Sequence, residues 1–250
     1  MSVSYVICTY RDFESFKETF LSVLPLLRSF DEVVVVDSNE SDIVQRFLDN
    51  FDKSQIVYDH LTPSGVYSAY NHGIKMSRGD WVQIIASGDI LLDVPGSDVF
   101  ISSDVIVGSQ RAIFPGGEYE FVPQWQGTWP HQSMLVKRAV YDKLGQYDES
   151  FRITADQRFV CLIRGDSSTR VEFVSEPLTK YLGGGVSEKV NWSAATEYYA
   201  LYRLQGSGIS RSLVKSYLKL IFKLALRFFP RSCQSFVIIL YKRIIYFTPS

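Results

Sequence analysis

Cysteine is scarce in this chain, which contains only Cys8, Cys161 and Cys233. Three scattered cysteines cannot form the disulfide framework of a small secreted domain. Cys8 and Cys161 lie within apolar runs, where a small buried core residue is the simpler interpretation. The chain also passes from Met1 directly into a strand-like pattern, without the charged and apolar regions of a signal peptide. These features predict a cytoplasmic location.

The common phosphate-binding and catalytic motifs are also missing. The sequence has neither the G-x-G-x-x-G of dinucleotide folds nor the G-x-x-x-x-G-K-[ST] of a P-loop. HExxH, paired CxxC and G-x-S-x-G do not occur either. The phosphates of any bound nucleotide must therefore be neutralised by a metal, by basic side chains or by both. The longest uninterrupted apolar stretch near the C-terminus, residues 236–241, is too short to span a bilayer.

Acidic residues are absent from the last forty positions, which carry eight basic ones. The other 18 basic residues stand against 27 acidic ones, so residues 1–210 sum to −9. Between residues 211 and 231 a basic residue recurs at every fourth position, among aliphatic and aromatic side chains. On a helix this spacing gives a basic stripe beside an apolar surface, which is typical of membrane-surface helices. The basic positions are Arg211, Lys215, Lys219, Lys223, Arg227, Arg231, Lys242 and Arg243.

We therefore expect residues 209–250 to form a basic amphipathic helical tail that contacts an anionic membrane surface. The alternative is a tail that packs on the body of the protein or forms a dimer contact. Nucleic acid is disfavoured as a partner, because the basic residues are embedded in aliphatic runs and the body of the protein is acidic.

The first half of the chain alternates between strand-like and helix-like patterns. Runs at residues 3–9, 31–37, 54–58 and 81–86 resemble strands, and apolar periodicity over 13–27, 43–51 and 65–77 indicates helices. This alternation predicts an α/β fold with a parallel sheet, whose ligands bind outside the carboxyl ends of the strands. The second half is less regular. It has strand-like runs at 105–109, 120–122 and 171–174 and a short helix at 138–144.

Three of the predicted strands end on residues that suit ligand chemistry: Thr9, Asp37 and Ser87-Gly88-Asp89. A carboxylate such as Asp89 can hold Mg²⁺ or Mn²⁺ together with substrate phosphates. A second acid, Asp156, stands in an apolar, helix-compatible stretch and can take a proton. Each residue also has a simpler interpretation: Gly-Asp as a turn, Asp156 as an exposed acid at a helix start.

Nine segments of the chain form a recognisable series: residues 4–10, 35–42, 65–74, 79–81, 86–89, 131–133, 145–151, 155–156 and 183–187. In order and spacing they resemble the inverting glycosyltransferase family 2, of GT-A fold, and in particular its bacterial members that build surface polysaccharides. The resemblance covers roughly residues 2–190.

The resemblance implies a role for individual residues. Asp89 would bind the metal, Mn²⁺ or Mg²⁺, and Asp156 would be the catalytic base. His131 and Gly184 would lie near the diphosphate or the acceptor, although for His131 a satisfied core or loop histidine is the competing interpretation. The nucleotide, most simply that of a UDP-sugar, would contact Thr9, Tyr10, Asp37, Asn71 and Ser87. The chain departs from the family pattern at residues 37–40, which read Asp-Ser-Asn-Glu instead of Asp-Asp-Gly-Ser or Asp-Gly-Gly-Ser.

These observations predict a GT-A glycosyltransferase domain over residues 1–208, followed by the tail. The enzyme would move a sugar from a nucleotide-diphosphate sugar to a hydroxyl of a lipid-linked saccharide at the inner face of the cell membrane. A glycine-rich loop, Gly183–Gly185, would close over the donor. The alternatives are a catalytically silent relative in a membrane assembly complex and a sugar-phosphate nucleotidyltransferase. The latter needs a Gly- and Lys/Arg-rich loop after the first strand, which Thr9-Tyr10-Arg11-Asp12 does not supply.

Overall fold

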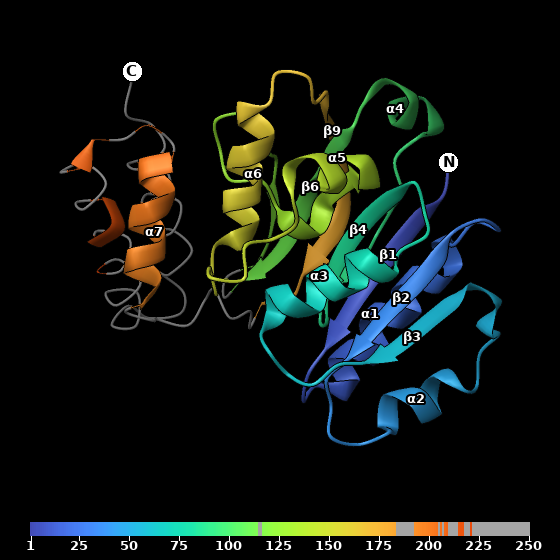
Figure 1. Ribbon diagram of the computed structural model, residues 1–250. Helices are drawn as coiled ribbons and strands as arrows, with labels where there is room; N and C mark the ends of the chain where they lie inside the picture. Colours follow the sequence, from blue (N-terminus) through green and yellow to red (C-terminus); the bar gives the residue numbers. More distant parts are fainter. Residues whose placement is uncertain are drawn as a thin grey trace.

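The computed structural model describes residues 1–114, 117–183 and 193–204, together with residues 206, 208–209, 215–217 and 221. Within these residues the chain forms one mixed sheet with helices on both faces (Figure 1). No helix in this described part combines the length and the apolar character that crossing a bilayer requires. The predicted tail of residues 209–250 falls outside the described residues except for 209, 215–217 and 221.

The first half of the chain builds the parallel part of the sheet. Its four strands are ordered β3-β2-β1-β4, and each pairs with its neighbours in parallel. The alternation predicted for this half is confirmed, with boundaries within a few residues. The elements are β1 (Val3–Thr9), α1 (Phe13–Val23), β2 (Glu32–Asp37), α2 (Ile43–Leu48), β3 (Ile56–His60), α3 (Val66–Met76) and β4 (Trp81–Ala86), with 3-10 turns at Leu24–Leu26 and Lys53–Gln55.

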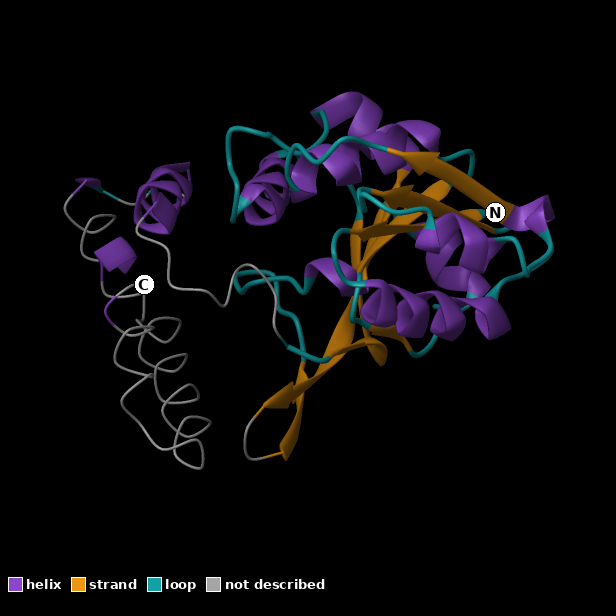
Figure 2. Ribbon diagram, turned by 90° about the horizontal axis from the view of Figure 1, so that it is seen from below, coloured by secondary structure: helices purple, strands orange, loops and turns teal. Residues whose placement is uncertain are grey.

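The second half extends the same sheet in the order β8-β6-β9-β5, with β7 paired to β6 as a hairpin. Strand β8 runs antiparallel to β4, so the sheet changes direction at this junction. The β6–β7 hairpin projects from the body of the domain (Figure 2). The elements are β5 (Ile90–Leu91), α4 (Ser97–Ser102), β6 (Val105–Phe114), β7 (Gly117–Phe121), a 3-10 turn at His131–Ser133, β8 (Met134–Lys137), α5 (Arg138–Leu144), α6 (Ala155–Gly165), β9 (Val171–Tyr181) and α7 (Ser193–Leu204).

Two apolar cores lie on opposite faces of the sheet. Alternate residues of a strand point to opposite faces, so Val6 enters one core while Tyr5 and Ile7 enter the other. Helices α3, α5 and α6 cover the first face, and α1, α2 and α4 cover the second. Burial on both faces explains why β1, β2 and β4 are nearly continuous apolar runs in the sequence.

Helix α3 packs unusually closely on the sheet at Gly73. A Cβ atom at that position would lie 2.3 Å from Cγ1 of Val6, so only glycine allows this approach. The contact brings α3, which carries Tyr67 and Tyr70, close to β1.

Candidate active site

The carboxyl ends of β1, β2 and β4 meet at one edge of the sheet, as the topology predicts. Thr9 is the register partner of Asp37, and Cys8 is that of Ala86. The loop after β2 joins the end of β1 directly, because the Ser38 N–H donates to the Thr9 carbonyl at 2.9 Å. Ser87, Gly88 and Asp89 follow Ala86 on the same edge. The predicted strand-end residues Thr9, Asp37 and Ser87-Gly88-Asp89 therefore lie along one edge.

Asp37 organises the loop that follows β2. Its side chain is fully buried, and one oxygen accepts hydrogen bonds from the backbone N–H of Asn39 at 2.8 Å and from its side-chain amide at 2.7 Å. The other oxygen accepts from the Tyr58 hydroxyl at 3.1 Å. Burial, with a further contribution from Asp37, raises the pKa of Tyr58 to about 12, so this hydroxyl stays protonated and remains a donor. Asp37 therefore holds the loop in place through these hydrogen bonds. Its direct contact with a nucleoside stays a prediction.

Asn39 links the loop after β2 to the loop after β1. Its side-chain oxygen accepts from the Arg11 backbone N–H at 2.6 Å, and Arg11 has a φ of 55°, which is uncommon for a residue other than glycine. The Arg11 guanidinium lies 2.9 Å from Glu40 and 5.0 Å from the ring centroid of Tyr10, which is 49% exposed. The exposed ring of Tyr10 and the cationic side chain of Arg11 therefore lie beside this edge, and both suit contact with a nucleotide.

The strand-end motif of β4, Ser87-Gly88-Asp89, forms a turn that contains a buried acid. Gly88 has a φ of 99°, which favours glycine, and its N–H donates to Thr19 Oγ1 at 2.9 Å. The Asp89 N–H donates to the Ala86 carbonyl at 2.9 Å, and Asp89 is only 3% exposed. The turn and the site interpretation are therefore compatible, because the turn holds the carboxylate inside the edge instead of in solvent.

The donor set at this turn fits a divalent cation that shares its coordination with a ligand. Among the described residues there is no group of three or more His, Cys, Asp or Glu side chains able to hold a metal by themselves. The buried hydroxyl of Ser87, two residues from Asp89, has no hydrogen-bond partner within this part of the chain. One carboxylate and one hydroxyl are hard oxygen donors, and phosphate oxygens of a bound diphosphate would complete the shell that Mg²⁺ or Mn²⁺ prefers.

Asp156 lies in the first turn of α6 and is held by both of its oxygens. One oxygen lies 2.9 Å from the Tyr67 hydroxyl, and the other accepts from the Gln157 amide at 3.1 Å. The Tyr67 hydroxyl is also 3.0 Å from the carbonyl of Ile153. Burial, with Asp156 adding to it, raises the pKa of Tyr67 well above its ordinary value, so its hydroxyl remains protonated. Asp156 is therefore an oriented, half-buried carboxylate and not a freely exposed helix-start acid.

A buried tyrosine connects this acid with the strand-end edge. Tyr70 of α3 has a pKa raised well above its ordinary value, first by burial and then by Cys8, Asp89 and Asp156. Asp89 and Asp156 come from opposite halves of the chain, yet both lie near enough to this one hydroxyl to contribute to its raised pKa. The sequence alone indicates no role for Tyr67 or Tyr70, because their spacings of four residues to Asn71 and three residues to Gly73 are ordinary for a buried helix face.

His131 is buried between Tyr70 of α3 and Tyr147. It is 9% exposed, its ring lies 5.3 Å from that of Tyr70, and its Nε2 lies 2.7 Å from the Tyr147 hydroxyl. Burial lowers the pKa of His131, and the nearby Asp156 opposes this effect only in part. The imidazole is therefore neutral near pH 7. His131 is therefore a buried histidine with a hydrogen-bond partner. Its contact with a diphosphate or an acceptor stays a prediction.

Asn71 is used mainly to hold the loop between α5 and α6. Its side-chain oxygen accepts from the Tyr147 N–H at 3.0 Å, and its amide donates to the Tyr147 carbonyl and to Glu149, each at 2.9 Å. These contacts fix the position of the Tyr147 ring beside His131. The predicted nucleotide contact of Asn71 is not tested by them. Gly184, predicted to lie near the acceptor, falls outside the described residues.

Residues 4–91, which include the carboxyl ends of β1, β2 and β4, match the model of the family described as glycosyl transferase family 2. An uncharacterized glycosyltransferase of Mycobacterium tuberculosis is 26% identical over 196 residues, which are 71% of each chain. A PGL/p-HBAD biosynthesis glycosyltransferase of Mycobacterium bovis is 25% identical over 146 residues, 51% of this chain and 56% of that protein.

Solved structures agree on the fold. A structure of S. aureus TarS 1–349 in complex with UDP-GlcNAc superposes with a TM-score of 0.66 and 16% identity, covering 97% of this chain and 78% of that one. A longer TarS structure gives a TM-score of 0.64 and 15% identity, covering 89% of this chain but only 43% of its own length. Residues 4–91 therefore match glycosyl transferase family 2, the chain has the GT-A fold, and the protein is a glycosyltransferase.

Proposed function

We propose that this glycosyltransferase is metal-dependent and inverting, and that it moves a sugar from a nucleotide-diphosphate sugar to a hydroxyl of a lipid-linked saccharide in bacterial surface polysaccharide synthesis. The observation that supports this most is the oriented carboxylate of Asp156, which is bound by the Tyr67 hydroxyl and by the Gln157 amide. The second acid, Asp89, is buried at the strand-end edge, and both acids contribute to the raised pKa of Tyr70. A displacement with inversion can use one acid to hold the metal of the donor and the other to take the proton of the acceptor.

In the proposed reaction Asp156 takes the proton of an acceptor hydroxyl. The acceptor oxygen forms its bond to the anomeric carbon as the bond from that carbon to the diphosphate oxygen breaks, and the nucleoside diphosphate leaves with the electron pair. Attack from the face opposite the leaving group inverts the anomeric centre. Tyr67 and Gln157 support this role, because they hold one oxygen each and thereby fix the direction in which the carboxylate can accept a proton.

The donor would lie across the carboxyl ends of β1, β2 and β4, with its nucleoside near Thr9, Tyr10 and the loop shaped by Asp37. Asp89 and Ser87 would hold Mn²⁺ or Mg²⁺ together with the diphosphate, and the metal would neutralise charge on the leaving group. A UDP-sugar is the proposed donor, which agrees with a TarS 1–349 structure that contains UDP-GlcNAc.

Donor binding is the direct test of this proposal. A UDP-sugar with Mn²⁺ is expected to raise the Tm, and a donor at 100 times its Kd adds about 2.7 kcal/mol of stability. In a chain of this size that corresponds to roughly 5–10 °C. A thermal-shift panel of UDP-, GDP- and dTDP-sugars, each with and without Mn²⁺, measures the shift, and release of the free nucleoside diphosphate measures turnover. Binding without any release would instead favour the catalytically silent partner.

The tail is proposed to take the enzyme to its acceptor on the cytoplasmic leaflet. Each Lys or Arg near an anionic membrane contributes about 1 kcal/mol, so eight basic residues suffice without a spanning helix. A chain that ends after Gly208 is expected to bind donor as the full chain does but to act poorly on a lipid-borne acceptor. Liposome flotation and transfer to lipid-linked and soluble acceptors measure the two properties.

Raised salt distinguishes the electrostatic part of membrane binding from the apolar part. Charge attraction is screened by salt and apolar insertion is not, so raised salt should weaken liposome binding only in part. Neutral liposomes are the matched control, because they keep the apolar contribution alone. A full-length chain that ignores anionic liposomes at low salt and forms a dimer that dissociates on truncation would identify the tail as an oligomer contact.

A further inference from the structure

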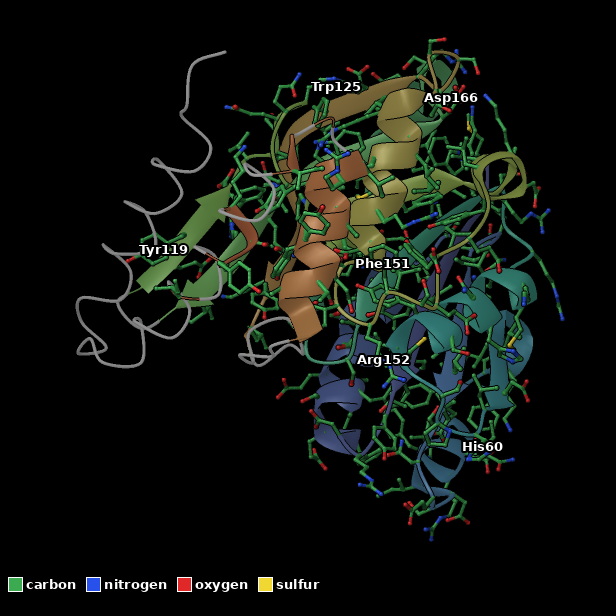
Figure 3. The ribbon with its side chains drawn as sticks, turned by 60° about the vertical axis from the view of Figure 1, so that its left-hand side comes forward. His60, Tyr119, Trp125, Phe151, Arg152 and Asp166 are labelled. Carbon is green, nitrogen blue, oxygen red and sulfur yellow. The ribbon has the colours of Figure 1, made fainter. Side chains whose placement is uncertain are left out.

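Glu197, in the middle of α7, binds the segment that leads into α6. Its carboxylate accepts hydrogen bonds from the backbone N–H groups of Arg152 at 2.8 Å, Ile153 at 2.9 Å and Thr154 at 2.9 Å, and lies 3.2 Å from the Thr154 hydroxyl. Figure 3 labels Phe151 and Arg152 in this segment. Thr154 is the N-cap residue of α6, and its own side chain makes no capping bond. A side chain 43 residues further along the chain from Thr154 therefore binds this backbone.

An apolar contact supports the same junction. Ile153 packs with Tyr198 and Tyr202 of α7 in a small cluster in which each residue is less than 10% exposed. Helix α7 lies beside α6 (Figure 1) and contacts it. The carboxylate and the two rings are on one helix and bind one short segment, so the described part of α7 is docked through both polar and apolar contacts.

Ile153 connects this junction to Asp156. Its N–H donates to Glu197, and its carbonyl lies 3.0 Å from the Tyr67 hydroxyl, which in turn lies 2.9 Å from Asp156. Residues 152–154 also determine where the first turn of α6 begins, and Asp156 lies in that turn. A negative charge at the start of a helix is stabilising, so this end of α6 favours a carboxylate over a neutral side chain. Movement of the segment would move both the backbone of Asp156 and its Tyr67 donor.

We propose that Glu197 is a positioning residue for catalysis: it fixes residues 152–154 and thereby the orientation of the Asp156 carboxylate. This inference rests on the proposed role of Asp156 as base. It makes α7 part of the active-site architecture and not merely a connection to the tail. A misplacement of about 1 Å in a reacting group can cost on the order of 10²-fold in rate.

The test uses Glu197→Gln in the full-length chain. This variant keeps the size of the side chain but removes the charge and replaces one acceptor oxygen by an NH₂ group, so at least one of the three N–H groups loses its acceptor. We expect kcat to fall by roughly 10–100-fold, up to the loss on the order of 10²-fold that a misplacement of about 1 Å can cause, with donor Kd changed by less than about twofold. Glu197→Asp keeps the charge at shorter reach and should recover part of the loss. Glu176→Gln, at an exposed position of β9, is the matched control for loss of charge and should retain normal kcat.

A double-mutant cycle separates positioning from a general structural effect. If Glu197 acts through Asp156, adding Glu197→Gln to Asp156→Asn should lower the residual rate little further, because the base is already missing. Normal kcat in Glu197→Gln, or a loss that adds in full to that of Asp156→Asn, would overturn the inference. Hydrogen exchange should show faster exchange of the residue 152–154 amides in Glu197→Gln, and unchanged protection there would contradict the contact itself. Normal turnover of Asp156→Asn would instead refute the proposed base, and the exchange result would still decide whether Glu197 holds the segment.

Discussion

Asp156→Asn is expected to lower turnover by a factor on the order of 10²–10⁴, which is the range for removal of a positioned general base. Asparagine has nearly the same shape, and its oxygen can still accept from the Tyr67 hydroxyl, so α6 and the pocket should keep their structure. It cannot take a proton from an acceptor hydroxyl. Because the base acts on the acceptor, donor affinity should stay nearly unchanged. Steady-state kinetics with varied acceptor and calorimetry with donor measure the two quantities.

The matched control is Asp142→Asn, which changes an exposed acid on the neighbouring helix α5 by the same atoms. It should leave both kcat and donor Kd unaffected. A large loss of donor affinity in Asp156→Asn at normal kcat would make Asp156 a donor-binding residue. In that case another residue of the candidate site would have to be the base.

The sequence predicts the first half of the fold well, because its strands and helices follow from local patterns of apolar residues. Strands β1, β2 and β4 are short, apolar and buried on both faces, so composition alone locates them. Their parallel order then places Thr9, Asp37 and Asp89 at one edge without any knowledge of side-chain contacts. The donor side of the candidate site follows from these two rules.

The second half resists prediction because its strands are irregular and partly exposed. Strand β9 was predicted only over residues 171–174 but continues to Tyr181 through the exposed Ser175 and Glu176 and through Pro177. Pro177 pairs with Ser109 where the register with β6 shifts on both sides. A proline at an irregularity of this kind is compatible with a strand, yet in the sequence it indicates the end of one.

The proposed acceptor side of the site depends on contacts between residues far apart in the chain. Tyr67 lies 89 residues before Asp156, and Glu197 lies 44 residues after Ile153. Nothing in the local pattern of any of these residues indicates its partner. Asp37 illustrates the same limit on the donor side, since its burial and its bonds to Asn39 and Tyr58 follow from how the loops fold back on the edge.

Asp89→Ala is expected to abolish metal-dependent donor binding. Asp89 is the single acid of the strand-end motif of β4, so removing it leaves the Ser87 hydroxyl as the remaining side-chain oxygen of that turn. A metal bound through one carboxylate and a diphosphate loses its charged protein ligand, and the diphosphate then has no fixed counter-charge. The stabilisation by a UDP-sugar that Mn²⁺ adds should disappear, and turnover should fall with it.

The fold should survive this change, because the turn is held by backbone bonds of Gly88 and Asp89 to Thr19 and Ala86 that do not use the carboxylate. Asp89→Asn keeps the size of this buried side chain and is the second variant, with the same expected loss of metal-dependent binding. Asp98→Ala, at an exposed position of α4, controls for the removal of an acid and should bind donor and metal normally. Unchanged turnover of Asp89→Ala and Asp89→Asn would remove Asp89 from the metal site, and the charge of the leaving diphosphate would then have to be met by basic side chains such as that of Arg11.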